Sequence, residues 1–316
     1  MQDTNVLKRG LSIVSRCKKE TKDIWHAHFG VAAIASYFFS KENNLALDTV
    51  NQISSQTTAM LNKHALGETI DVMHGVDFQK AEDMILTALE KNINGLHWVG
   101  HNVIYTALSL LAIRELHNWG TQEDIEGIAD LILSFEKTIP GRSWIGFSTS
   151  EVKRLQINNN DTISSINNPE KLSEFILKEL SQFKVIYKAE AHHDLIGHML
   201  TFSHALNILH DLGHVSFFKK GLVSLLKLVQ VLRESQNLKL DEPIKLNSPV
   251  DCLPLVRKKQ ATALPTEELF WLKDHSHSDW DFGHQFKFSL SYFNHLQRAS
   301  GYKDSTMENF RYIISF

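Results

Sequence analysis

Histidines are concentrated in one short part of this 316-residue chain. Six of its seventeen histidines fall between Ala191 and His214, in the sequence AHHDLIGHMLTFSHALNILHDLGH. A random distribution of the same histidines would place about one of them there. Imidazole titrates near neutral pH and is the commonest metal ligand in proteins. The cluster therefore predicts acid–base chemistry, metal binding or both.

The position of each histidine along a helix separates these residues into two groups. Read as a helix, the stretch places His198 and His204 among apolar residues, where their ring nitrogens need a metal, an acidic partner or a polar substrate. His192, His193 and His214 lie near the ends, where we expect them to cap or face solvent. We interpret His198 and His204 as candidates for a site; the alternative is that hydrogen bonds satisfy them in the core.

Two further histidine pairs have a spacing of four residues. His97 and His101 occur in GLHWVGHNVIY, and His210 is followed by His214. Residues four apart share a helix face, so each pair can present two imidazoles to one metal ion. The alternative for each pair is a polar helix end or a hydrogen-bonded core histidine.

Aromatic and ionisable residues also gather near both ends of the chain. His26 and His28 lie in WHAHF, at the start of a strongly apolar segment. Asp281, His284 and Lys287 lie in DWDFGHQFKF, a pattern that suits a helix start directed into a pocket. The alternative for the second segment is an aromatic plug over the end of a helix bundle.

The elements that would position these residues are helices. Apolar residues recur at three- and four-residue intervals in eight segments, and no segment has the alternation typical of a strand. These segments are Ile24–Phe39, Ala81–Leu89, Leu96–Leu116, Ile125–Phe135, Leu172–Phe183, His193–Leu212, Leu222–Leu232 and Phe286–Leu296. Helix-start signals occur at Thr121 and at Asn168. The pattern predicts eight to ten helices.

We expect an all-α protein, built as a multi-helix bundle or an α/α-toroid-like array. The stretch 241–265 contains four prolines and cannot be a continuous helix. It is predicted to be a long loop within a single domain covering residues 1–316. The alternative is that a domain boundary falls within this loop.

Composition excludes several classes of function. The net charge is −3, and the 33 basic residues form no stripe suited to a nucleic-acid backbone. No segment has eighteen consecutive apolar residues, so we expect no membrane span. Cys17 and Cys252 match no metal or disulfide pattern, which favours a cytoplasmic protein. Nucleophile-elbow, zincin and Gly-rich phosphate-binding motifs are absent from the sequence.

One short segment resembles the His-Asp signature of HD-domain metalloenzymes. It is ILHDLGHVSFF, residues 208–218, and contains His210 directly followed by Asp211. The resemblance implies that these two residues bind a metal ion. The implied reaction is phosphoester hydrolysis or, in some members, oxygenation.

A second resemblance extends over most of the chain. The segments WHAHFGVAAIASYFF, HWVGHNVIY, HMLTFSHALNIL and DFGHQFKFSL, in this order, are similar to the questin oxidase-like family. The resemblance implies oxidation of an aromatic or polyketide-like small molecule, with NADPH as reductant. No Gly-rich nicotinamide-binding motif accompanies it. The corresponding residues would be His26, His97, His101, His198 or His204, His284 and Lys287.

These observations favour an oxidoreductase with a histidine-lined pocket for a small organic molecule. The predicted catalytic residues are His101, His198, His204 and His284 around a metal ion or a reacting oxygen, with Asp281 and Lys287 orienting or neutralising the substrate. The predicted metal is iron, manganese or zinc. The alternatives are an HD-type phosphohydrolase and a non-catalytic helical binding module. Candidate metal ligands are His26, His97, His101, His198, His204, His210 and Asp211.

Overall fold

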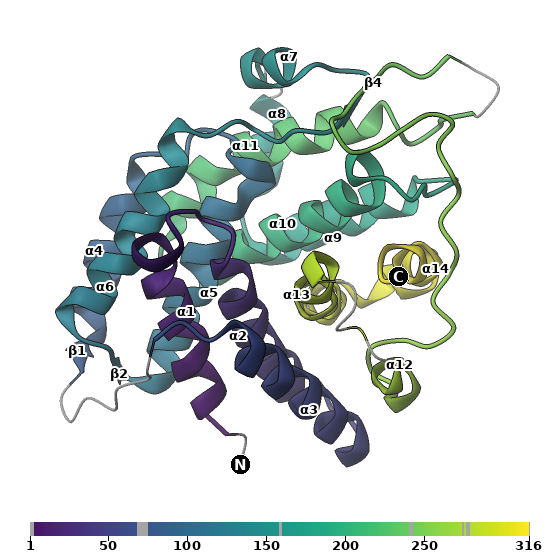
Figure 1. Ribbon diagram of the computed structural model, residues 1–316. Coiled ribbons are helices and arrows are strands. Elements are labelled where there is room, and N and C mark those ends of the chain that lie inside the picture. Colours follow the sequence, from purple (N-terminus) through teal and green to yellow (C-terminus); the bar gives the residue numbers. More distant parts are fainter. Residues whose placement is uncertain are drawn as a thin grey trace.

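Helices form almost all of the regular structure of this protein (Figure 1). The computed structural model describes residues 3–67, 75–157, 160–239, 243–273, 275 and 279–315, with the backbone alone at 160–162 and 279–282. Within these residues the only sheets are two pairs of two-residue strands. The expectation of an all-α protein is confirmed.

The described residues contain fourteen α-helices and four short strands. The helices are α1 (Asn5–Thr21), α2 (Ala27–Glu42), α3 (Leu47–His64), α4 (Phe78–Glu90), α5 (His101–Leu116), α6 (Gln122–Leu133), α7 (Thr149–Arg154), α8 (Asn160–Ser165), α9 (Pro169–Ser181), α10 (Leu195–Asp211), α11 (Val215–Arg233), α12 (Glu268–Leu272), α13 (Asp279–Arg298) and α14 (Lys303–Ile313). The strands are β1 (Val76–Asp77), β2 (Asn118–Trp119), β3 (Trp144–Ile145) and β4 (Leu246–Asn247), paired antiparallel as β1–β2 and β3–β4.

Each of the eight predicted helical segments corresponds to a helix, but the chain has more helices than expected. The additional ones are α1, α3, α7, α8, α12 and α14. Both predicted start signals are confirmed. Thr121 forms a reciprocal capping box with Asp124, and the Asn168 side chain accepts a hydrogen bond from the Lys171 N–H, directly before Pro169.

Three helices are buried around almost their whole circumference and form the centre of the molecule. Thirteen of sixteen residues are buried in α2, twelve of sixteen in α5, and fifteen of seventeen in α10. A helix that is apolar on every side must be covered on every side. Accordingly α10 packs against α5, α9, α11 and α13, while α2 packs against α1, α3, α5 and α13.

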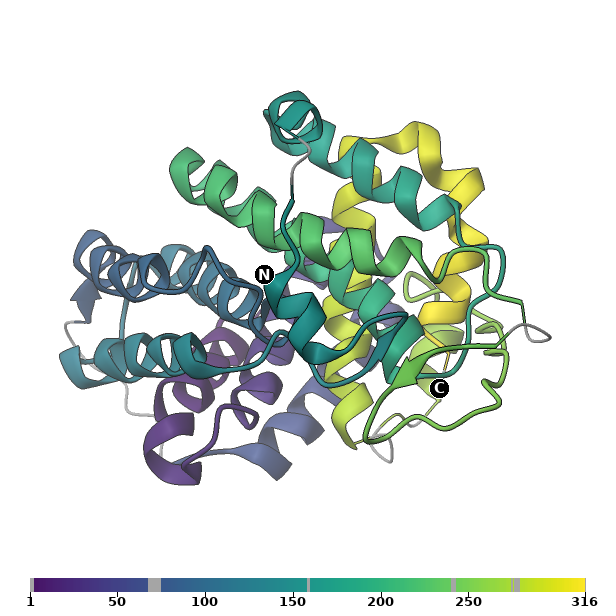
Figure 2. The same cartoon turned by 90° about the horizontal axis from the view of Figure 1, so that it is seen from above.

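The two halves of the chain meet at this centre. In Figures 1 and 2 most of the N-terminal helices (purple to blue) lie on one side, and α9, α10, α12, α13 and α14 (teal to yellow) lie on the other. Helix α13 packs against both α2 and α10. The N-terminal and C-terminal halves therefore share one hydrophobic core.

The proline-containing stretch is irregular over its described part, residues 243–265, apart from the short strand β4. It crosses the surface between α11 and α12, and β4 pairs with β3. The helices on either side of it, α11 and α13, both pack against α10. Among the described helices, none is long and apolar enough to span a membrane.

Candidate metal centre

Four helices that are distant in sequence each contribute one histidine to a single cluster. These are His28 of α2, His101 at the start of α5, His198 of α10 and His284 of α13. Their ring centroids are 5.7 Å apart for His28 and His101, 4.9 Å for His101 and His198, 4.9 Å for His198 and His284, and 4.7 Å for His284 and His28. Each is at most 3% exposed. The contacts close a ring, which we call the four-histidine cluster.

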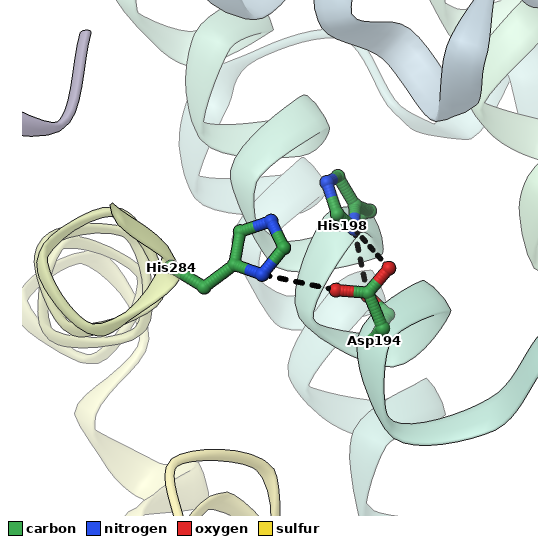
Figure 3. Close-up of side chains that lie close together, drawn as sticks. All are labelled: Asp194, His198 and His284. Atoms are coloured by element: carbon green, nitrogen blue, oxygen red, sulfur yellow. Dashed lines mark hydrogen bonds and ion pairs between the residues drawn. The ribbon is translucent and has the colours of Figure 1, made fainter. Parts of the chain in front are cut away.

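Asp194 links two members of the cluster (Figure 3). It ends a π-helical turn, Glu190–Asp194, that leads into α10. One carboxylate oxygen lies 3.3 Å from His198 Nδ1, and the other lies 3.2 Å from His284 Nδ1. Burial raises the pKa of Asp194, but His198 and His284 outweigh it and hold the pKa well below its ordinary value. Asp194 is therefore an anion that orients two imidazoles.

Backbone carbonyls determine which ring nitrogens of His101 and His198 carry a proton. His101 Nδ1 lies 2.5 Å from the Trp98 carbonyl oxygen, and His198 Nδ1 lies 2.8 Å from the Asp194 carbonyl oxygen. A carbonyl only accepts, so each Nδ1 must donate, and Nε2 of the neutral ring keeps its lone pair. Both Nε2 atoms are buried without a hydrogen-bond partner among the described residues. This is the arrangement typical of metal-binding histidines.

The interior of the cluster favours uncharged side chains. Burial is the main cause that lowers the pKa of His28 well below its ordinary value. Burial, followed by His198, does the same for the pKa of His101. Lys287 Nζ lies 3.0 and 2.8 Å from the two ring nitrogens of His28, and burial lowers its pKa well below the ordinary value. Near neutral pH these groups are therefore nitrogen lone-pair donors.

A strained turn places His101 and its carbonyl partner. Trp98, Val99 and Gly100 have φ values of 40°, 54° and 98° in succession. Such values are costly for residues with a Cβ and tend to occur at functional sites. The N–H groups of Trp98 and Val99 donate to the carbonyls of Ile139 and Pro140, both at 2.8 Å. These bonds hold the turn so that α5 begins with an imidazole directed into the cluster.

Glycine and an aromatic ring support the opposite side of the cluster. The Phe288 ring stacks on His284, with centroids 4.7 Å apart and planes within 8°. A Cβ at Gly197 would lie 2.3 Å from the Phe288 ring. Only glycine therefore lets α10 approach α13 closely enough for this stack to form.

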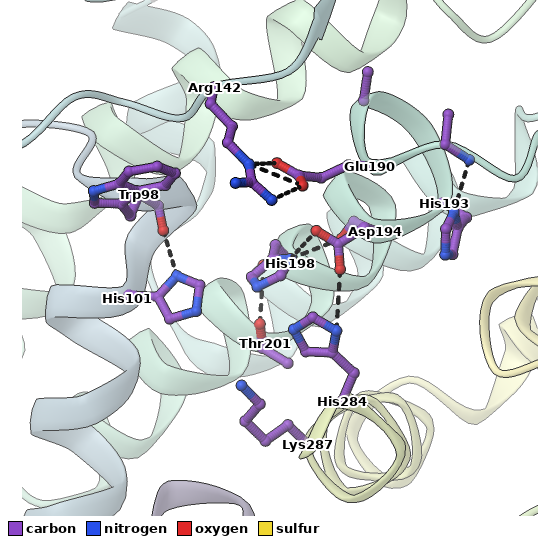
Figure 4. Close-up of polar contacts among 12 residues, drawn as sticks. Trp98, His101, Arg142, Glu190, His193, Asp194, His198, Thr201, His284 and Lys287 are labelled. Carbon is purple, nitrogen blue, oxygen red and sulfur yellow. Dashed lines mark hydrogen bonds and ion pairs between the residues drawn. The ribbon is translucent and has the colours of Figure 1, made fainter. Parts of the chain in front are cut away.

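A cavity of about 270 Å³ leads to the cluster. His101 and His198 line it together with Trp25 and Trp98, whose rings meet edge to face at 4.6 Å. Arg142 and Glu190 form an ion pair at this cavity, with Nη2 and Oε2 2.7 Å apart (Figure 4). The cavity thus combines aromatic walls with a charged pair, and two of its lining residues carry the unpartnered Nε2 atoms.

The predicted site residues divide into those that meet in this cluster and those that do not. His101, His198 and His284 lie together (Figure 4), and Lys287 contacts the cluster through His28. Asp281 lies outside the residues whose side chains the structure describes.

His204 lies on α10 with His198 but in different surroundings. Its Nδ1 is 3.1 Å from Ser291 Oγ, its ring centroid is 6.2 Å from that of His295, and it lines a separate cavity of about 560 Å³. Six residues of helix turn a side chain through about 240° and move it about 9 Å along the axis. The expectation that His204 joins His198 at one centre is therefore corrected.

His97 and His26 are also outside the cluster. His97 has extended backbone angles (φ −120°, ψ 115°), because α5 begins only at His101, so the two do not share a helix face as predicted. The Nδ1 of His97 is 3.3 Å from Thr138 Oγ1. The Nε2 of His26 is 2.8 Å from the His64 carbonyl oxygen.

The His-Asp segment lies at the end of α10. The Asp211 side chain is 45% exposed, and one carboxylate oxygen is 2.5 Å from Arg298 Nη2. His210 Nδ1 is 3.9 Å from the other carboxylate oxygen. Among the described residues, neither belongs to a group of three or more side chains able to hold a metal ion.

The histidines expected to face solvent are not free surface residues. His192 is fully buried and its Nδ1 accepts a hydrogen bond from the Tyr187 N–H. His193 is 9% exposed and its Nδ1 accepts from the Ala189 N–H. His214 pairs with Glu82 at 2.7 Å. The expectation of solvated ends is wrong for His192 and His193, because the turn before α10 folds back onto the core, whereas His214 is partly exposed at the start of α11.

Two important residues were absent from the predicted set. His28 is two residues from the predicted His26, and the choice between them depends on which side of α2 faces α13. Asp194 lies four residues before His198, a spacing that places both on one helix face. That Asp-x-x-x-His spacing was the available signal for Asp194.

The ring spacings of the four-histidine cluster are close to those around a metal ion, but its four sets of ring nitrogens do not converge on one point. Imidazole nitrogens bind metals at about 2.1 Å, so at tetrahedral or octahedral angles neighbouring ring centroids lie roughly 4.6–5.3 Å apart. Three of the four measured spacings lie within this range and the fourth is 5.7 Å. Among the described residues, the set whose ligand atoms all lie within 4.8 Å of one another is Asp194, His198 and His284, and neither His28 nor His101 belongs to such a set. The Nδ1 donation of His198 to a carbonyl favours Asp194 as an orienting partner over a direct ligand.

Comparisons of the chain with protein-family models, with curated proteins and with solved structures found no match. The resemblances to questin oxidase-like and HD-domain proteins therefore depend on the sequence motifs alone. The geometry of the four-histidine cluster is the stronger basis for a functional proposal.

Proposed function

We propose that this protein is a metal-dependent oxidoreductase that acts on a small organic molecule. The observation that carries the proposal is the closed ring of four buried histidines, in which the Nε2 atoms of His101 and His198 are buried and have no hydrogen-bond partner within the described part of the chain. Leaving polar atoms buried and unpaired is costly unless they serve a ligand. In this proposal a metal ion bound within the ring would satisfy them, once the imidazoles turn to direct these nitrogens toward it.

The donor set indicates which metal to expect. Imidazole nitrogens suit iron, copper, nickel and zinc better than magnesium or calcium. Four imidazoles would complete a tetrahedral zinc site and close it, whereas an octahedral iron site keeps two further positions. We therefore expect iron. A bound iron ion would supply one-electron chemistry with dioxygen at those positions.

The side chains of this protein would prepare the site for that chemistry. Asp194 holds His198 and His284 through their Nδ1 atoms and contributes a negative charge near the centre. Lys287, kept uncharged by burial, is a neutral hydrogen-bond partner for His28. The surrounding helices exclude water, which protects a reactive centre from side reactions.

The cavity indicates the kind of substrate. Trp25 and Trp98 offer aromatic surfaces, and His101 and His198 face both the cavity and the cluster. A planar, largely apolar molecule would place its reacting carbon beside these two imidazoles. This agrees with the aromatic substrate class implied by the questin oxidase-like resemblance. NADPH as the reductant is implied by that resemblance alone.

Metal analysis of the wild type and of two alanine variants tests the proposal. Untagged protein should bind about one iron per chain in an anaerobic Fe(II) titration, and His198→Ala should lose it. His204→Ala is the matched control, because it removes a buried histidine from the same helix but outside the cluster. Circular dichroism would establish that each variant folds. An iron–nitrosyl EPR signal in the wild type would demonstrate an open coordination position.

Other outcomes would overturn the proposal in favour of a named alternative. Loss of metal in His210→Ala but not in His198→Ala would support the HD-type phosphohydrolase. Stoichiometric zinc with no uptake of iron would indicate a closed structural site. Absence of any stoichiometric metal would favour a helical binding module.

A further inference from the structure

A second and larger cavity lies outside the four-histidine cluster. It has a volume of about 720 Å³, within the size range of small-molecule and cofactor sites. One wall is the segment 256–263, and the other is formed by α12 with Lys273 and His275. We call this cavity the basic groove.

The walls of the groove are held in place by backbone hydrogen bonds. The Lys188 N–H donates to the Val256 carbonyl at 2.8 Å, and the Lys258 N–H donates to the Ile186 carbonyl at 2.9 Å. The Ala261 N–H donates to the Arg311 carbonyl at 2.9 Å. The segment is thus fixed to the helical body at both ends, and the groove is a preformed concavity.

Positive charge is concentrated in the groove. Among its described lining residues five are lysine or arginine and none is aspartate or glutamate. The chain as a whole has a net charge of −3, so the groove reverses the overall sign locally. A concave surface lined by charges of one sign focuses the field and attracts counter-ions. The five cationic residues are Lys188, Arg257, Lys258, Lys259 and Lys273.

Exposed apolar side chains lie among the basic residues of the groove. Val256, Leu269 and Leu272 line the groove and are 66%, 62% and 57% exposed. Large hydrophobic residues exposed together in a concavity are typical of binding sites. Phe270 and Ala263 add apolar surface at its base, and both are buried. A ligand that matches this lining has an anionic group and an apolar part.

We propose that the basic groove binds a small amphipathic anion, a phosphate or carboxylate attached to an apolar chain or ring. The anionic group contacts Lys188, Arg257 and Lys259, for which no ion pair is described. The apolar part lies against Leu269 and Leu272. A concave site of this volume suits a free molecule better than a flat membrane surface or a nucleic-acid backbone.

Calorimetric titration with octyl phosphate tests this proposal. We expect one binding site per chain, and affinities at least about tenfold weaker for inorganic phosphate and for octyl glucoside, because each lacks one half of the ligand. The Arg257→Glu, Lys259→Glu double variant should weaken octyl phosphate binding at least about tenfold. Both residues are exposed, so the fold should be preserved.

A matched double variant separates a local effect from net charge. Lys80→Glu, Lys91→Glu makes the same change in charge at exposed positions outside the groove, and it should bind octyl phosphate like the wild type. Equal binding by the Arg257, Lys259 variant and the wild type would overturn the proposal, as would equal weakening in both double variants. A third outcome is that the wild type, but not the Arg257, Lys259 variant, sediments with phosphatidylglycerol vesicles and does not bind free octyl phosphate. The groove would then be a membrane contact and the proposal would be overturned.

Discussion

Replacing Asp194 with asparagine is the most informative change to the four-histidine cluster. The carboxylate oxygens of Asp194 lie 3.3 and 3.2 Å from the Nδ1 atoms of His198 and His284, so one anion serves two rings. Asparagine has nearly the same shape but a single acceptor oxygen. Its NH₂ group would face the Nδ1 of one of the two rings, and that ring would lose its contact with an anionic oxygen.

The magnitude follows from the orienting contact that is lost. Loss of an orienting partner of a metal-binding histidine typically costs about 10- to 100-fold in metal affinity. We therefore expect Asp194→Asn to weaken Fe(II) binding about 10- to 100-fold while keeping one site per chain.

Anaerobic calorimetric titration with Fe(II) would measure this change. Glu190→Gln is the matched control, because Glu190 lies at the same cavity but pairs with Arg142. It should leave iron affinity unchanged. Wild-type affinity in Asp194→Asn would refute the orienting role. Complete loss of iron, beyond about 1,000-fold, would show that Asp194 is itself a ligand.

Two further predictions concern stability. Burial lowers the pKa of His295 to about 4, so the folded state binds its proton less readily than the unfolded state, and stability present above about pH 6.5 is lost as the pH falls toward 4. When the pH falls from about 7.5 to 5.5, the unfolding free energy of the wild type should fall by about 1 kcal/mol more than that of His295→Gln. Urea titrations at both pH values would measure this difference. Equal losses in the two proteins would contradict the prediction. Gly197→Ala should cost about 1–3 kcal/mol, because the new Cβ overlaps the Phe288 ring, and should also weaken iron binding. Gly301→Ala, where a Cβ meets no neighbour within 4 Å, is the control, and equal stability of the two variants would disprove the packing argument.

The amino-acid sequence by itself determined the helices and part of the site. Apolar periodicity is a local property, so it located α2, α5, α10 and α13 before any contact between them was known. It also identified His198 as an inward-facing histidine, because its neighbours along the helix are apolar. His101, His284 and Lys287 were recognisable as candidates from their residue types and their neighbours in the sequence.

Only the tertiary structure decided which histidines meet. His198 and His204 both face the interior, but helical rotation directs them to different neighbours, and the packing of α13 brings His284 to one and Ser291 to the other. The packing of α2 against α13 selects His28 over His26. A strained turn, which propensity does not foresee, removes His97 from the helix. Residue type and apolar periodicity are local properties of the sequence, whereas the meeting of side chains from different helices depends on how whole helices pack.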